Sequence, residues 1–343
     1  MKKSFICSQS FFALVGLFIA LFISSCTKSE VTKSTDRYEA PKILSFESFE
    51  AFKEVKGKVI SMSLQELEIY EESKGYKSFG RMCDEIYYGK DPEEFKSVEE
   101  IKEFVSKNNK YLQLTEDTNG EFSMGTSLRD NSNRYFINDD RMLRIGTSIY
   151  KVFETGVAMT DEKNYEVLKG ISNESSITLF PSNVHFTSFI SIPSKIVASK
   201  DDENNCGVEI QHTVTNGSNR TIIALSRGWW DGYDINNVPV TVCEINAIVR
   251  PQKRTLGVWF NCTRTLSCDL KIAVDINKES IWDRQYYYAS ESGTSASFLE
   301  YQFLDLATFG YWATPPMHFG GYDCWGSSPS AGPTYVQCNV ELF

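Results

Sequence analysis

The chain has 343 residues, of which 41% are hydrophobic and 23% are charged. This ordinary globular composition excludes a disordered protein, a collagen-like fibre and a membrane protein with many spans, and the length suffices for two domains of about 150 residues each. The formal net charge of −10 makes nucleic acid a poor partner, because the phosphate backbone and an acidic protein repel each other. Three histidines restrict metal and acid–base chemistry.

The first 25 residues have the features of an export signal. Lys2 and Lys3 precede an apolar run of thirteen residues, Phe11 to Ile23. Such a run suits the h-region of a signal peptide and is shorter than the about 20 residues that a membrane-spanning helix needs. The residues Ile23-Ser24-Ser25-Cys26 that end it resemble the lipobox of bacterial lipoproteins, which implies cleavage before Cys26 and acyl chains on that cysteine.

The mature protein is therefore expected to be attached to a membrane through lipid on Cys26. Two or three acyl chains hold a protein on a bilayer durably, at about 0.8 kcal/mol for each buried CH₂. Removal of residues 1–25 takes away Lys2 and Lys3 and no acidic residue, which changes the net charge from −10 to −12. Residues 26–42 are a polar tether that Pro41 closes. We expect an outer-membrane lipoprotein that faces the periplasm or the cell surface.

Nine cysteines divide into four groups. Cys7 leaves with the signal, Cys26 carries lipid, and Cys83 lies in a helical pattern that favours a buried free thiol. The other six follow residue 205, and an exported chain favours three disulfides among them over zinc, since no C-x-x-C pair occurs. The predicted pairs are Cys206 with Cys243, Cys262 with Cys268, and Cys324 with Cys338.

Residues 43–171 are predicted to form a helix-rich α+β domain. Phe46, Phe49, Phe52 and Val55 recur every third residue before Gly57 breaks the run. The S-x-x-E capping boxes at 63–66 and 97–100 each begin a helix. A further helix covers 76–86 and a short one 161–168. The turn signal Asn119-Gly120 predicts a hairpin, and short strands are expected on either side of Gly146 and at 156–159.

Residues 172–343 change to a period of two. Apolar residues alternate over 208–214, 243–249, 256–262, 270–276 and 336–342. Alternation is typical of strands with one buried face, so this half is predicted to be an all-β antiparallel sandwich. The fold class is then α+β: a helix-rich amino-terminal unit followed by a disulfide-bonded sandwich domain.

The order of these segments resembles a known group. The lipobox, the SFESFEAF helix, the YLQL and EFSM strands and the MLRIGTSIYKV strands together resemble the uncharacterised lipoproteins, domains of unknown function, of Bacteroides and related gut bacteria. The resemblance implies an exported, lipid-anchored protein. It implies no active-site residues.

Catalytic motifs are scarce. The sequence lacks G-x-S-x-G, H-E-x-x-H, G-x-G-x-x-G and the EF-hand loop. His185 is expected to point outward from a strand, and His212 to be hydrogen-bonded on a strand face. His318 lies near Asp323 and Cys324, but a disulfide-bonded cysteine is no nucleophile. No cofactor and no metal is expected.

One segment has the composition of a binding site. Its tryptophans, tyrosine and carboxylates are predicted to lie in a glycine-flanked loop, where flat rings beside carboxylates suit a sugar or a peptide; they are Trp229, Trp230, Asp231, Tyr233 and Asp234. Trp312 and Trp325 are further candidates. The alternative is that these rings cap the core of the sandwich.

The sequence therefore predicts a lipid-anchored, non-enzymatic envelope protein that binds a glycan or peptide ligand. One alternative is a carbohydrate-active hydrolase that uses two of the carboxylates Asp231, Asp234 and Asp283. Another is an adhesin or assembly subunit that polymerises by strand exchange. The sequence leaves the oligomeric state open.

Overall fold

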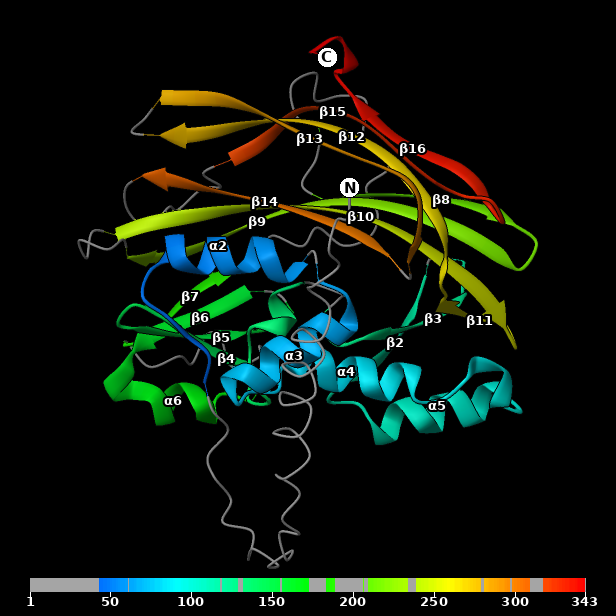
Figure 1. Cartoon of the computed structure of the whole chain (residues 1–343), viewed down its shortest axis with the longest axis horizontal. Coiled ribbons are helices and arrows are strands. Elements are labelled where there is room, and N and C mark those ends of the chain that lie inside the picture. The colour runs from blue at the N-terminus through cyan, green and yellow to red at the C-terminus, as the bar shows by residue number, and fades with distance from the viewer. Residues whose placement is uncertain are drawn as a thin grey trace, which may run out of the picture. The chain divides into compact units, whose positions relative to one another are not determined.

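Three β-sheets and five α-helices make up the part of the chain that the structure describes (Figure 1). Pro41–Phe343 forms one compact unit. The predicted signal peptide, Cys26 and the tether 26–42 lie outside the described residues. The structure, a computed structural model, describes residues 43–60, 62–117, 119–128, 132–154, 156–172, 183–188, 206, 209–233, 239–278, 281–296, 298–308 and 317–342.

Three of the helices begin after a serine whose side chain caps them, namely Ser63, Ser78 and Ser97. Ser63 and Glu66 form the predicted reciprocal capping box, and Ser97 accepts from the Glu100 amide, whereas the Glu100 carboxylate bonds the Lys96 amide. Gly57 does not end the first helix, because the apolar face continues past it. The helices are α2 (Phe49–Ile60), α3 (Leu64–Lys74), α4 (Phe79–Tyr88), α5 (Val98–Lys107) and α6 (Tyr165–Gly170).

The first sheet has the strand order β1-β4-β5-β6-β7. Its strands are β1 (Ser45–Phe46), β4 (Met142–Ile145), β5 (Ser148–Val152), β6 (Gly156–Asp161) and β7 (His185–Ser188). The β4–β5 turn at Gly146, where φ is 59°, is the predicted one. Only β1 pairs in parallel; the other neighbours are antiparallel.

The central sheet has the order β2-β3-β11-β10-β9-β8, and β14 also pairs with β10. Its strands are β2 (Leu112–Glu116), β3 (Phe122–Thr126), β8 (Glu209–Asn216), β9 (Asn219–Tyr233), β10 (Pro239–Thr255), β11 (Val258–Asn261) and β14 (Leu299–Thr308). β10 pairs with β9 along one side; along the other it pairs first with β14 and then with β11.

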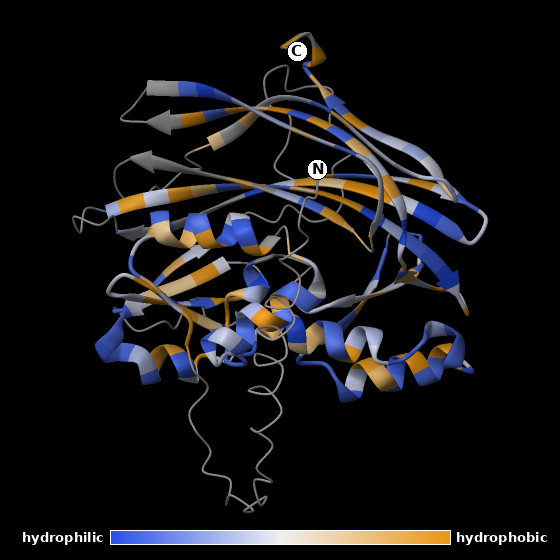
Figure 2. Ribbon diagram, viewed as in Figure 1, coloured by the Kyte–Doolittle hydropathy of each residue, from blue (hydrophilic) through white to orange (hydrophobic). Residues whose placement is uncertain are grey.

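The outer sheet has the order β13-β12-β15-β16 and is antiparallel throughout. Its strands are β12 (Arg264–Lys278), β13 (Ile281–Ala296), β15 (Met317–Ser328) and β16 (Gly332–Cys338). Apolar and polar residues alternate along these long strands (Figure 2). The alternation ends at Cys338, since Val340–Leu342 forms a 3₁₀ turn and not the predicted end of a strand.

The outer sheet and the central sheet enclose an apolar core between them. Alternate residues of each strand face this core, among them Ile245 and Val249 of β10, Leu270 of β12 and Phe319 of β15. The opposite side of β10 is covered too, because Val240 and Val242 pack against the core that α2 and the first sheet share. β10 is thus buried on both faces, whereas its alternating sequence predicted one.

The predicted domain boundary after residue 171 does not coincide with a break in this fold. Strand β3 pairs with β11 in parallel, with Phe122 beside Val258, so a hairpin of the first half extends a sheet of the second. Strand β7 lies beyond residue 171 and completes the first sheet through β6. The chain is mixed in α and β structure and rich in strands, but the helical segments and the sheets share their cores.

Candidate functional site

The segment predicted to be a binding loop is part of strand β9. Backbone pairing with β10 runs from Asn219 to Tyr233 without a break, so the two glycines near the tryptophans do not open a loop. Tyr233 is half-buried and packs against the core beneath α2. The side chains of Trp229 and Trp230, and all of Asp234 and Trp312, lie outside the described residues, so their ligand contacts stay a prediction.

Asp231 faces the interior and is only 5% exposed. The hydroxyls of Thr187 and Thr241 donate to its two oxygens at 2.9 and 2.8 Å, and His185 Nε2 lies 2.8 Å from Oδ2. His185 was predicted to point outward from its strand, but its ring, 38% exposed, contacts this buried carboxylate. Because β7 belongs to the first sheet and β9 to the central sheet, this cluster joins two sheets, and its carboxylate is buried between them.

The face of the outer sheet that points away from the core is the strongest candidate for a binding surface. Residues directly opposite each other on antiparallel strands share a face. Lys271 of β12 is opposite Tyr288 of β13 and Asp323 of β15, and Asp323 is opposite Gln337 of β16. The core lies on the other side, where Leu270 and Ile272 point. We call this surface the open face.

Four aromatic side chains lie on the open face. Tyr286 and Tyr288, two residues apart on β13, are 44% and 61% exposed. Trp325 of β15 is partly exposed, and it is opposite Tyr335 of β16, which is 51% exposed. Rings at outward positions of a sheet can present their faces to planar or ring-shaped ligands.

Polar side chains separate the aromatic ones. Lys271 Nζ lies 3.7 Å from an Asp323 oxygen and 3.9 Å from an Asp269 oxygen, and Gln337 Nε2 donates to Asp323 Oδ1 at 2.9 Å. At such distances the ammonium is not closely hydrogen-bonded to either carboxylate. A ligand hydroxyl placed here has both a donor and acceptors within reach.

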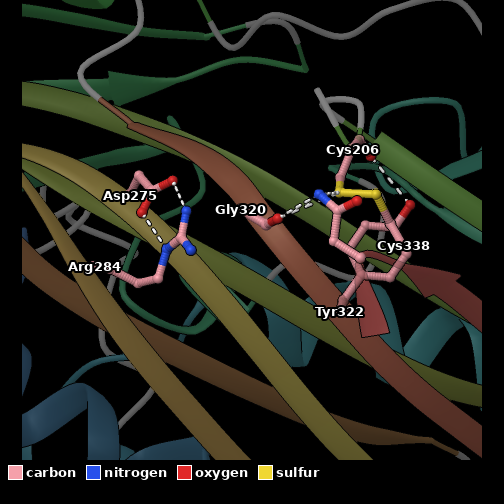
Figure 3. Close-up of a disulfide and its surroundings, with 7 residues drawn as sticks. Cys206, Asp275, Arg284, Gly320, Tyr322 and Cys338 are labelled. Carbon is pink, nitrogen blue, oxygen red and sulfur yellow. Dashed lines mark hydrogen bonds and ion pairs between the residues drawn. A yellow bond between two sulfur atoms is a disulfide. The ribbon is translucent and has the colours of Figure 1, made fainter. Parts of the chain in front are cut away.

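One end of the open face is held by an ion pair across two strands. Arg284 of β13 donates two bonds to Asp275 of β12, Nε to Oδ1 at 2.6 Å and Nη2 to Oδ2 at 2.7 Å (Figure 3). A Cβ atom at Gly320 would lie 3.0 Å from Asp275 Oδ2, so glycine lets β15 pass this pair closely. The register of β12 and β15 shifts at this point.

A disulfide fixes the strand at the other edge of the sheet. Cys206 is bonded to Cys338, the last residue of β16; the Tyr322 hydroxyl donates to the Cys206 carbonyl, and Asn339 donates to the Gly320 carbonyl (Figure 3). The bridge joins residues 132 positions apart and anchors the strand that carries Tyr335 and Gln337.

This pairing corrects the three predicted bridges. The Cys206–Cys243, Cys262–Cys268 and Cys324–Cys338 pairs are not formed, and neither Cys243, Cys262, Cys268 and Cys324 nor the buried Cys83 is disulfide-bonded. Most of these cysteines are buried in the core because they lie on apolar strand faces. Burial alone does not bring two sulfur atoms close enough to form a bond. Burial raises the pKa of Cys324 to about 12 and also raises the pKa of the Cys262 and Cys268 thiols, which makes them poor nucleophiles.

The enzyme alternatives find little support in these positions. Asp231 and Asp283 belong to different sheets, and Asp283 accepts a 2.6 Å hydrogen bond from Gln285.

His212, predicted to be hydrogen-bonded, is exposed and its Nδ1 lies 2.7 Å from the Thr334 hydroxyl. The described residues contain no group of three or more His, Cys, Asp or Glu side chains that could hold a metal ion, and no described helix is long and apolar enough to span a membrane.

Sequence reasoning missed most of the open face. Of this surface, only Trp325 was identified from the sequence, and nothing connected it with Tyr286, Tyr288 or Tyr335. The alternating pattern of β16 indicates that Tyr335 points outward, because it lies between the inward residues Thr334 and Val336. An aromatic residue at an outward position of a strand is the feature that could have identified it.

Comparison with known proteins gives this chain no family. No protein-family model matches it, and no curated protein does. Among solved structures it is similar to a DUF4848 family protein from Bacteroides thetaiotaomicron, with 14% sequence identity, a TM-score of 0.28 and coverage of 86% of this chain and 97% of that chain. So low a TM-score carries no functional argument, and the function is argued from the open face alone.

Proposed function

We propose that this protein is a non-enzymatic binding module whose ligand is a glycan held on the open face of the outer sheet. The observation that carries the proposal is the group of exposed rings, Tyr286, Tyr288 and Tyr335, together with Trp325, on one face of the outer sheet. Sugar rings have apolar faces that stack on aromatic rings and hydroxyls that bond to carboxylates and ammonium groups. Lys271, Asp269 and Asp323 provide such groups between the rings.

A glycan fits this surface better than a protein ligand. Three charged side chains, Lys271, Asp269 and Asp323, lie between the two groups of rings, and charged residues are scarce at the centre of protein–protein interfaces. The rings also lie on paired strands: Trp325 is on β15, which pairs on both sides, and the three tyrosines are on the edge strands β13 and β16, which each pair on one side. A rigid surface loses little conformational entropy when it binds.

The proposal is tested by titration calorimetry with uncharged hexasaccharides: cellohexaose, xylohexaose, mannohexaose and maltohexaose. We expect at least one to bind, and Tyr288→Ala or Trp325→Ala to weaken that binding at least about fivefold, as loss of an aromatic anchor of 1 kcal/mol or more implies. Tyr88→Ala is the matched control, because Tyr88 is 44% exposed on α4, away from this face. Absence of binding by all four at millimolar concentration would overturn the proposal.

We further propose that the module is displayed on the cell envelope by lipid on Cys26. The support is the sequence of residues 1–26, with its positive start, apolar run and terminal cysteine. Cys26→Ala is expected to release the protein from the membrane fraction without changing its stability. Retention of this variant in membranes after high-salt washing would contradict the anchor.

A further inference from the structure

We infer that the ligand of the open face is an uncharged oligosaccharide that lies across the strands, with one sugar unit on the β13 tyrosines and another on Trp325 and Tyr335. This inference rests on the proposed function and adds the direction, minimum length and charge of the glycan. It follows from the register of the four strands, the positions of the rings and the charges between them.

The rings form two groups at opposite sides of the sheet. Tyr286 and Tyr288 belong to β13, and Trp325 and Tyr335 to β15 and β16. β12 lies between the two groups. Neighbouring strands are about 4.8 Å apart, so β13 and β15 are separated by about 10 Å. One sugar ring is too small to cover both groups, and a chain that contacts both must cross β12.

A glycan chain that crosses the strands also passes over the polar side chains of the open face. Tyr288 is followed in its row by Lys271, Asp323 and Gln337, and the next row runs from Ser290 through Asp269 to Trp325 and Tyr335. A chain that runs from Tyr288 to Trp325 passes over Lys271 and Asp269. A chain that follows β13 instead meets two tyrosines and then Ser290 or the Arg284–Asp275 pair, and it reaches no ring of the second group.

The charges of the open face select against acidic glycans. Asp269 and Asp323 carry two negative charges and Lys271 one positive charge, while Asp275 is neutralised by the bidentate bond from Arg284. The remaining charge is negative, and the whole chain carries −10. A polyanionic sugar chain would be repelled here, whereas neutral hydroxyls can accept from Lys271 and donate to the carboxylates.

A chain-length series tests the inference. Cello-, xylo-, manno- and malto-oligosaccharides of one to six units are titrated against the full mature chain, together with oligogalacturonate of six units as the acidic probe. We expect affinity to rise at least tenfold between one and four units in the series that binds, and the galacturonate not to bind. Tyr288→Ala and Trp325→Ala should each lower hexasaccharide affinity at least fivefold, and Tyr88→Ala should not change it.

The outcomes separate this inference from the proposed function. The crossing of the strands is overturned if a monosaccharide binds as tightly as the hexasaccharide, or if only one of the two aromatic variants loses affinity. Neither result contradicts the proposed glycan-binding function. Binding of oligogalacturonate as tight as that of the neutral chains overturns the charge selection. Failure of every neutral hexasaccharide to bind overturns the proposed function and this inference together. Circular dichroism of each variant confirms that the strands are intact.

Discussion

Lys56 of helix α2 and Glu244 of strand β10 form an ion pair that is buried from water, with Nζ 3.2 Å from Oε2. Asn133 joins both side chains: it accepts from Lys56 and donates to the Glu244 carboxylate at 3.3 Å. Asn246 donates to Glu244 as well, at 3.1 Å. Burial lowers the pKa of Lys56, and the Glu244 charge opposes that change. The cluster fixes the position of α2 on the second face of β10.

Breaking this pair from one side is expected to destabilise the fold strongly. Lys56→Met leaves the Glu244 carboxylate buried without its counter-ion, and such a loss costs about 3–5 kcal/mol in the free energy of unfolding. The matched control is Lys58→Met on the same helix, since the Lys58–Glu54 pair is 64% and 70% exposed and contributes at most about 1 kcal/mol. Urea unfolding measures both variants. Equal effects of the two substitutions would contradict a buried pair.

The Cys206–Cys338 disulfide is expected to contribute a large part of the free energy of unfolding. It closes a loop of 132 residues, and removal of a disulfide commonly costs about 2–5 kcal/mol. Cys338→Ser should therefore lower the free energy of unfolding by that amount, and addition of a reductant should lower the wild-type value equally. The reductant should have no effect on the variant. A wild-type protein that is insensitive to reductant would show that the bridge is not formed.

The cysteines outside the Cys206–Cys338 bridge are expected to differ in their accessibility. Cys262 is partly exposed, whereas Cys83, Cys243, Cys268 and Cys324 are buried in the cores. Iodoacetamide under native, non-reducing conditions should label Cys262 first, slowly because its pKa is raised, and the other four only after denaturation. Peptide mass spectrometry resolves the sites. Native labelling of Cys206 or Cys338 would contradict the pairing.

Lys151 is expected to contribute stability that grows as the pH rises from about 8 to 10.5. Burial lowers the pKa of this ammonium to about 8, against 10.5 in the unfolded chain, while the Asp140 charge opposes the change. Between these two values the unfolded state binds a proton that the folded state does not, so raising the pH favours folding. Lys151→Met should remove this rise when urea unfolding is followed from pH 7 to 10.5. An unchanged slope in the variant would assign the effect to other groups.

Local features were predictable from the sequence. The capping box at Ser63 and Glu66, the N-cap Ser97 and the turn at Gly146 depend on side chains and backbone within a few residues, and the structure has all of them. Gly57 was expected to end a helix, but α2 continues to Ile60 because its apolar residues pack against the core. A weak local preference gives way to tertiary packing.

The candidate site was less predictable, since composition does not say which face a residue occupies. The Trp229–Tyr233 segment looks like a loop because of its glycines, yet it pairs with β10, and a side chain at Gly232 would meet the ring of Phe49. Asp231 is consequently an internal group. Tyr335 and Trp325 are neighbours only because β15 and β16 pair in one register.

The sequence by itself determined the helix caps, the period-two strands, the acidic charge and the segments expected to direct export. These properties depend on neighbours along the chain, for which residue type and spacing are sufficient. Only the tertiary structure decided that Cys206 pairs with Cys338, that Glu244 is buried beneath Lys56, and that four rings share the open face. Each of these depends on which strands lie beside each other and in which register, and a shift of one residue would turn every side chain to the other face.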